Sequence, residues 1–171
     1  QSPEDSADFW PIWRGIVAAV HPEPIDYMFA GENYGAELAQ QVGGLFVPLG
    51  GRVLSVVYNA DPLDYGHTLI LQHDAEGVPF YTLYGHLGGS LPKLLSVGDT
   101  VLPGQVIAHL GDWHENGGWA PHIHFQIMTD MLEQTDGNFF GVGHNSLWDV
   151  WQSICPDPNL VLRLPAAAFA V

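Results

Sequence analysis

The sequence predicts a mainly β domain built on an antiparallel β-sheet or sandwich, with an N-terminal helix and a short C-terminal helix. From Leu45 onward, short apolar runs alternate with turn residues, and no helical pattern separates one run from the next. The 171 residues are 47% hydrophobic and 12% aromatic, which is typical of a globular domain with a core of its own.

Residues 1–44 are predicted to form an N-terminal helix and an irregular lead-in. Apolar side chains recur at helical spacing from Trp10 to Val17, and Pro11 fits a first helical turn. A proline-rich stretch follows, where a regular element is not expected.

Residues 45–130 are predicted to form the β core. Their apolar runs are bounded by Gly, Pro, Asp and Asn, as strands joined by tight turns are. The expected strands are 45–47, 52–58, 68–73, 80–86, 100–102, 105–110 and 122–129.

Residues 131–171 are predicted to be a C-terminal extension that packs a short helix on the core. Ser146 is a candidate N-cap for a helix over 147–154. Trp148 and Trp151 are three residues apart there, so both are expected to face the core.

The charge balance excludes some classes of partner. Four basic residues against nineteen acidic ones give a formal net charge of -15, which argues against nucleic acid and against an anionic membrane. Cys155 is the only cysteine, so no internal disulfide forms. The first residues lack the pattern of a signal peptide, and no apolar stretch reaches the ~20 residues of a membrane span. A cytoplasmic location is therefore expected.

Two histidines mark the most informative stretch, residues 121–127. Successive side chains of a strand point to opposite faces, so His122, His124 and Gln126 are expected on one face and the apolar residues between them on the other. Adjacent imidazoles on a polar face indicate a metal or proton-transfer site, although a solvent-facing polar stripe is the simpler alternative.

Three further motifs surround this strand. Residues 80–87 form an expected strand in which Tyr84 and His86 share a face. Residues 97–107 follow the pattern VGDxVxxGQxI, and a glycine-bearing loop over 111–121 leads into the histidine pair.

This order of motifs resembles peptidase family M23, the zinc peptidases of the lysostaphin and LytM type. The resemblance implies a mostly antiparallel β domain with a groove across the sheet. It implies that His124 binds zinc, while His86 and His122 lie beside the metal as catalytic residues. A metal-bound water is acidified by zinc, and a nearby imidazole can exchange its proton.

One family motif is altered in this sequence. The resemblance requires a further His and Asp in an HxGxD motif, and the matching segment reads Asn33, Gly35 and Glu37. The expected metal ligands are therefore His124, Glu37 and Asn33. A neutral amide oxygen is a poor zinc ligand, so weak zinc binding is predicted. His114, in the glycine-bearing loop, and Tyr84 are additional candidates.

A closer resemblance covers most of residues 58–160 and is carried by the loop and strand over 116–131 and by the segment 155–160. Both are similar to the M23-like domain of bacterial fusion proteins, where it lies between an aminoglycoside-phosphotransferase-like domain and a class-III aminotransferase-like domain. This resemblance implies neighbouring domains in a larger chain and a cytoplasmic setting.

Three functions compete on this evidence. The favoured hypothesis is a domain with a degenerate zinc site that is weakly active or non-catalytic and binds a ligand or a partner domain in its groove. The alternative is an active zinc-dependent peptidase or amidase that cleaves a peptide or small amide with the help of His86 and His122. A lipoyl- or biotinyl-type carrier ranks last, because its lysine should lie at a hairpin tip and the only lysine, Lys93, precedes the VGDxVxxGQxI motif.

Overall fold

A computed structural model describes residues 44–165 of the chain. The expected helix near the N-terminus, together with Asn33 and Glu37, lies outside these residues. The strands are β1 (Leu45–Phe46), β2 (Gly51–Asn59), β3 (Gly66–Ala75), β4 (Val78–Leu87), β5 (Thr100–Val101), β6 (Val106–Ala108) and β7 (His124–Met128). The helices are α3 (Leu91–Leu94), the 3-10 helix η2 (Asn145–Leu147), α4 (Trp148–Ile154) and α5 (Asn159–Leu162).

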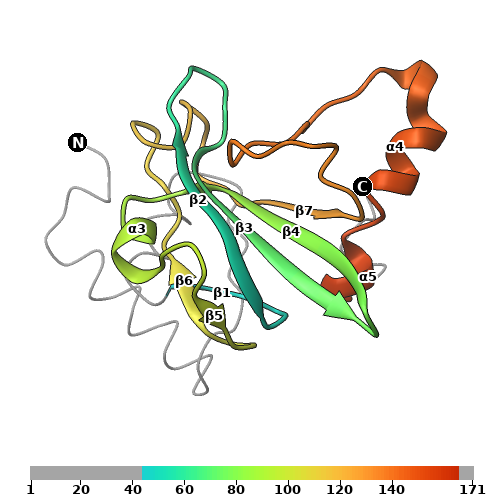
Figure 1. Ribbon diagram of the computed structural model, residues 1–171. Helices are drawn as coiled ribbons and strands as arrows, with labels where there is room; N and C mark the ends of the chain where they lie inside the picture. Colours follow the sequence, from blue (N-terminus) through green and yellow to red (C-terminus); the bar gives the residue numbers. More distant parts are fainter. Residues whose placement is uncertain (1–43, 166–171) are drawn as a thin grey trace, which may run out of the picture.

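All strand pairings are antiparallel, which confirms the predicted fold class. A five-stranded sheet has the order β5-β2-β3-β4-β7, and β1 pairs with β6 in a smaller sheet. The long strands β2, β3 and β4 form the centre of the molecule, with β7 along the outer side of β4 (Figure 1). No helix in the described part of the chain is long and apolar enough to cross a membrane.

Each face of the large sheet carries its own apolar cluster. Leu69 and Tyr84 are opposite one another on the first face, and Ile70 and Leu83 are opposite one another on the second, as the alternation of strand side chains requires. The first cluster includes residues of β6 and α3, such as Ile107 and Leu91. The small sheet and α3 therefore cover the first face.

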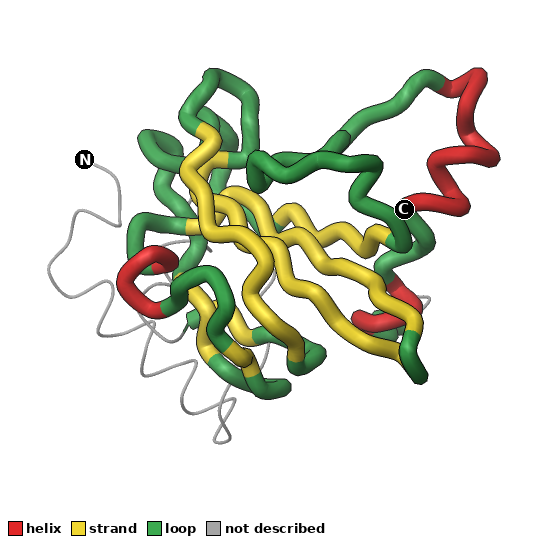
Figure 2. The backbone as a smooth tube through the Cα atoms, in the orientation of Figure 1, coloured by secondary structure: helices red, strands yellow, loops and turns green. Residues whose placement is uncertain are grey.

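The second face is covered by the C-terminal extension. Phe139 is buried in the second cluster, and Met131 and Ile154 pack against it. The backbone N–H of Thr129 donates to the carbonyl of Ile154 at 2.8 Å, which ties the end of β7 to the end of α4. In Figure 2 the long loop after β7 runs back past the sheet before it reaches the C-terminal helices.

Helix α4 ends at Ile154 as predicted, but the expected cap and the expected orientation of Trp148 are wrong. Helix α4 begins at Trp148 after the 3-10 helix, its N-cap is Leu147, and Ser146 does not cap it with its side chain. Trp148 is 58% exposed and does not face the core. Trp151 is half-buried and its ring contacts Phe140, 5.5 Å between centroids.

Candidate functional site

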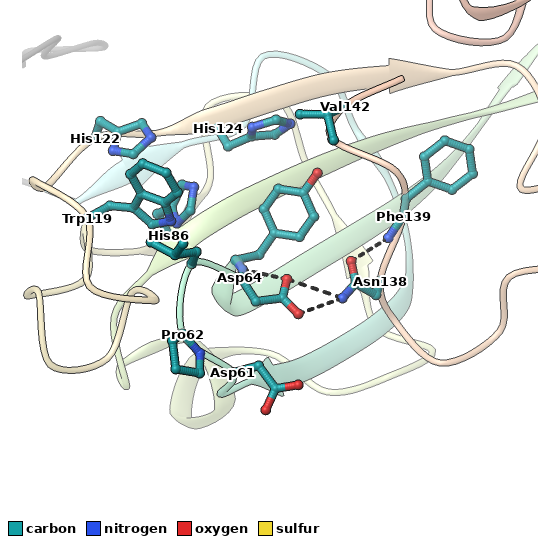
Figure 3. A pocket seen from close by; sticks show the side chains of 13 residues that line it. Asp61, Pro62, Asp64, His86, Trp119, His122, His124, Asn138, Phe139 and Val142 are labelled. Atoms are coloured by element: carbon teal, nitrogen blue, oxygen red, sulfur yellow. Dashed lines mark hydrogen bonds between the residues drawn. The ribbon is translucent and has the colours of Figure 1, made fainter. Parts of the chain in front are cut away.

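A pocket of about 460 Å³ opens on the face of the sheet that carries the second cluster. Four segments distant in sequence line it: the loop after β2, the end of β4, the approach to β7, and the start of the C-terminal extension. Figure 3 shows His122, His124, Trp119 and His86 on one side and Asp61, Asp64 and Asn138 on the other. The lining residues are Asp61, Pro62, Leu63, Asp64, Tyr65, His86, Trp119, His122, His124, Asn138, Phe139, Gly141 and Val142.

His86 reaches this pocket through an irregularity in β4. Its φ is +62°, a left-handed conformation that is uncommon outside glycine, and the register between β3 and β4 shifts at the same place. Tyr84 lies in the first cluster, opposite Leu69, whereas His86 lines the pocket. The expectation that Tyr84 and His86 share a face is therefore wrong, because the irregular backbone turns His86 away from the face that Tyr84 occupies.

Gly85 leaves room for the Tyr65 ring to pack against β4 at the pocket. It is opposite His124 in the register, and a Cβ at this position would lie 2.8 Å from Cδ1 of Tyr65 and 3.3 Å from Cβ of His124. The Tyr65 ring occupies the space above the glycine and contacts the His124 ring, 4.8 Å between centroids. A glycine between Tyr84 and His86 is thus required by the close approach of Tyr65.

His86 and His122 present the same ring nitrogen to the pocket. Nδ1 of His86 lies 2.8 Å from the carbonyl of Asn116, and Nδ1 of His122 lies 2.6 Å from the carbonyl of Ala120. A carbonyl only accepts, so each Nδ1 carries the proton and each Nε2 keeps its lone pair. The two rings are adjacent, 4.4 Å between centroids. The site therefore contains two neighbouring imidazoles whose Nε2 atoms are acceptors.

His124 has the opposite tautomer. Its Nε2 lies 2.9 Å from Oε1 of Gln126. The Gln126 amide nitrogen donates to the carbonyl of Phe140 at 3.1 Å and to Sγ of Cys155 at 3.2 Å, which fixes Oε1 as the acceptor. His124 therefore donates from Nε2 and keeps its lone pair on Nδ1. The predicted common face of His124 and Gln126 is confirmed by this bond.

Burial favours the neutral forms of His86, His124 and Tyr65. Burial lowers the pKa of His86 to about 4, assisted by His122 and His124 and opposed by the Asn116 carbonyl and Asp64. Burial also lowers the pKa of His124. Burial and the charge of Asp64 raise the pKa of the Tyr65 phenol to about 12. The rings of His86, His124 and Tyr65 therefore lie in the pocket in their neutral forms, close to the side chain of Asp64.

The other histidines of residues 44–165 lie outside the pocket lining. His114 is exposed in the loop before β7, and its ring contacts Trp113. His67 stacks on Tyr58, 4.3 Å between centroids. His73 is buried, with Nδ1 2.8 Å from the Gly50 carbonyl and Nε2 2.7 Å from the Thr82 hydroxyl. These contacts give His73 a structural role.

Several residues that line the pocket belong to no recognised motif and were not identified from the sequence. Asp64 and Tyr65 belong to a segment that reads as a plain turn, and Asn138 and Phe139 follow β7 in a segment without regular structure. Asn116 orders the loop before β7: its amide nitrogen donates to the carbonyls of Gly111 and Trp119, and its oxygen accepts from two backbone N–H groups. The Asn116-Gly117-Gly118 segment was the one sequence feature that pointed to a specialised loop here.

Comparison with known proteins gives one finding. Residues 32–136, more than half of the chain, match the family model described as Peptidase family M23. No curated protein and no solved structure matches the chain. The matched range contains all three histidines of the pocket and ends before Asn138.

Proposed function

Because the chain belongs to peptidase family M23, we propose that its pocket is a peptidase groove retained as a ligand-binding site, with a degenerate metal site and weak or no catalysis. One observation carries the proposal. His86, His122 and His124 meet at one pocket, while the segment expected to complete the metal site reads Asn33 and Glu37 instead of His and Asp.

The donor set does not fit a tight zinc site. Among residues 44–165, no three His, Cys, Asp or Glu side chains gather so as to hold a metal ion. His124 offers a single lone pair, on Nδ1, and the remaining ligands would have to be Glu37 and Asn33. Zinc prefers imidazole, thiolate and carboxylate ligands, and a neutral amide is a weak substitute. We therefore assign no reaction step to a metal.

The pocket suits a peptide or a small amide. The Nε2 atoms of His86 and His122 accept hydrogen bonds, and an amide N–H is a matching donor. Trp119, which is 39% exposed, and the buried Phe139 supply apolar walls. These groups bind and orient a ligand without requiring a charged imidazole.

The proposal also concerns the location of the domain and its neighbours in the chain. The loop built on Asn116 and the segment around Cys155, which carry the resemblance to the bacterial fusion proteins, both contact residues of the site. We propose that the domain works in the cytoplasm beside neighbouring domains of a larger chain.

Zinc binding tests the proposal. We expect weak, substoichiometric zinc in the wild-type protein, measured by metal analysis after dialysis and by competition with a chelating dye. Asn33→His combined with Glu37→Asp restores the family motif and should raise zinc affinity at least about tenfold, or about 1.4 kcal/mol. His124→Ala in that background should abolish the gain. His144→Ala is the control, because His144 is exposed and outside the pocket lining.

Two results would count against this function. Stoichiometric zinc in the wild type that is lost on His124→Ala would overturn the degenerate site and favour an active zinc peptidase or amidase. No gain from the restored motif would show that residues 33 and 37 do not complete the site.

A further inference from the structure

We propose that the groove recognises a primary ammonium group on a ligand that also carries an amide, with Asp61 and Asp64 forming the subsite for the positive charge. This inference rests on the proposed function, since it requires the groove to bind a ligand. It goes further by naming the chemistry of that ligand.

The charges that line the pocket have one sign. Asp61 and Asp64 both belong to the lining, and none of the basic side chains in the described part of the chain, Arg52, Lys93 and Arg163, does. The Asp64 carboxylate accepts from Nδ2 of Asn138 at 3.0 and 3.2 Å and from its neighbour's backbone N–H at 2.7 Å. These donors are neutral, so they orient the carboxylate and leave its charge uncompensated. A cation in the pocket would supply that compensation.

A second observation points to a missing polar partner. Tyr65 is only 7% exposed, and its hydroxyl is buried without a hydrogen-bond partner among the described residues. The side chain lines the pocket between His124 and Gly141. Buried hydroxyls are nearly always hydrogen-bonded, and leaving one unpaired costs roughly 1–3 kcal/mol. An amide carbonyl of the same ligand would accept from this hydroxyl.

The remaining polar atoms also select a donor-rich ligand. His86 and His122 present acceptor Nε2 atoms, as the bonds of their Nδ1 atoms to backbone carbonyls require. Together with two carboxylates they make a pocket of acceptors, which disfavours a carboxylate or phosphate ligand. An ammonium carries three donors. The exposed face of Trp119 adds a surface on which a cation is stabilised.

Paired neutral and cationic probes test this inference. L-Ala-L-Ala amide carries a free α-ammonium group, and its N-acetyl derivative replaces that ammonium with a neutral acetamide. Nα-acetyl-lysine amide places the ammonium on a side chain, so the probes distinguish a peptide amino terminus from a lysine. Binding is measured by isothermal titration calorimetry on the full 171-residue chain, with EDTA present throughout so that metal does not contribute.

We expect one of the two ammonium probes to bind at least about tenfold more tightly than the acetylated dipeptide amide, a difference of about 1.4 kcal/mol. Asp61→Asn and Asp64→Asn should each remove most of that preference. Asp61 is exposed, so its variant keeps the test valid if Asp64→Asn disturbs folding through the loss of its bonds to Asn138. Glu76→Gln, an exposed carboxylate in the turn between β3 and β4, is the matched control and should bind as the wild type does.

The outcomes separate the two proposals. Equal binding of charged and acetylated probes would refute the ammonium subsite and leave the groove as a binding site. A preference that survives both Asp substitutions would refute their role. If no probe binds, the ammonium proposal fails, while the zinc measurements still decide the state of the metal site independently.

Discussion

Gly85→Ala tests whether the pocket depends on the close packing of Tyr65 over β4. The added Cβ would lie 2.8 Å from a ring carbon of Tyr65 and 3.3 Å from Cβ of His124. Neither atom is the end of a flexible side chain: Tyr65 is buried in the second cluster, and His124 is held in β7 opposite Gly85. The ring or the strand must therefore move.

The expected cost follows from the effects of overpacking. Forcing an extra methyl group into a packed site costs about 1–3 kcal/mol. For a chain of this size, each kcal/mol shifts the melting temperature by about 2–4 °C. Urea denaturation should therefore show a lower midpoint with an unchanged m-value. Displacement of Tyr65 should also change the environment of His124, visible as a shift of its imidazole resonances in NMR spectra.

Gly89→Ala is the matched control for this substitution. Gly89 lies two residues after the end of β4, and the nearest atom to an added Cβ there is a carboxylate oxygen of Glu115 at 3.1 Å, the far end of a flexible side chain. The control should lose much less stability. If Gly85→Ala were as stable as the wild type, or if the two variants lost the same amount, the packing argument for Gly85 would be refuted.

Three other predictions follow from single contacts. Thr82→Val should cost about 1–3 kcal/mol in urea denaturation, because it leaves Nε2 of the buried His73 unpaired; Thr82→Ser should restore most of the loss. Asn116→Ala removes four hydrogen bonds from its loop and should cost roughly 2–4 kcal/mol, and a change within 0.5 kcal/mol would contradict the role assigned to that side chain. The pKa of His86 is about 4 in the folded protein and about 6.5 in the unfolded chain, so the unfolded chain takes up the proton first as the pH falls. The contribution of neutral His86 to the free energy of unfolding is therefore complete above about pH 6.5, and roughly 3 kcal/mol of it is lost as the pH falls toward 4. His86→Gln should flatten this slope, and an equal slope in both proteins would show that His86 is not its source.

The strands were largely predictable because their sequences carry strong local patterns. The apolar runs that suggested strands at 52–58, 68–73 and 80–86 lie within β2, β3 and β4, each slightly longer than expected. The turn between β3 and β4 is likewise local: the Asp74 carboxylate accepts from the backbone N–H of Gly77 at 2.9 Å, and Gly77 has a φ of +89°. Helices α3 and α5 were missed because each has only four residues, too few for a period to show.

The site was predictable only where strand alternation applies. His124 begins β7 and His122 lies two residues before it, outside the strand, while Ile123 and Phe125 pack on the first cluster as expected. The position of His86 was predicted by resemblance, but its face was not, because a register shift reverses the alternation that the sequence implies. The prediction that Trp148 faces the core was wrong for a different reason. Helical spacing identifies an apolar stripe on a helix but does not show whether another part of the chain packs against it.

The family match covers the residues on one side of the pocket but not those on the other. His86, His122, His124, Asp61 and Asp64 all lie within the matched residues 32–136. The opposite wall comes from the extension after residue 136, which also supplies the carbonyl and the thiol that fix Gln126.

This extension therefore acts on the histidines as well as closing the pocket. Oε1 of Gln126 accepts a hydrogen bond from Nε2 of His124 because the Gln126 nitrogen donates to Phe140 and Cys155. Asn138 in turn orients the Asp64 carboxylate. A change in the extension is therefore expected to alter both the tautomer of His124 and the orientation of the Asp64 carboxylate. The ligand preference that we propose thus depends on a segment that the family match does not include.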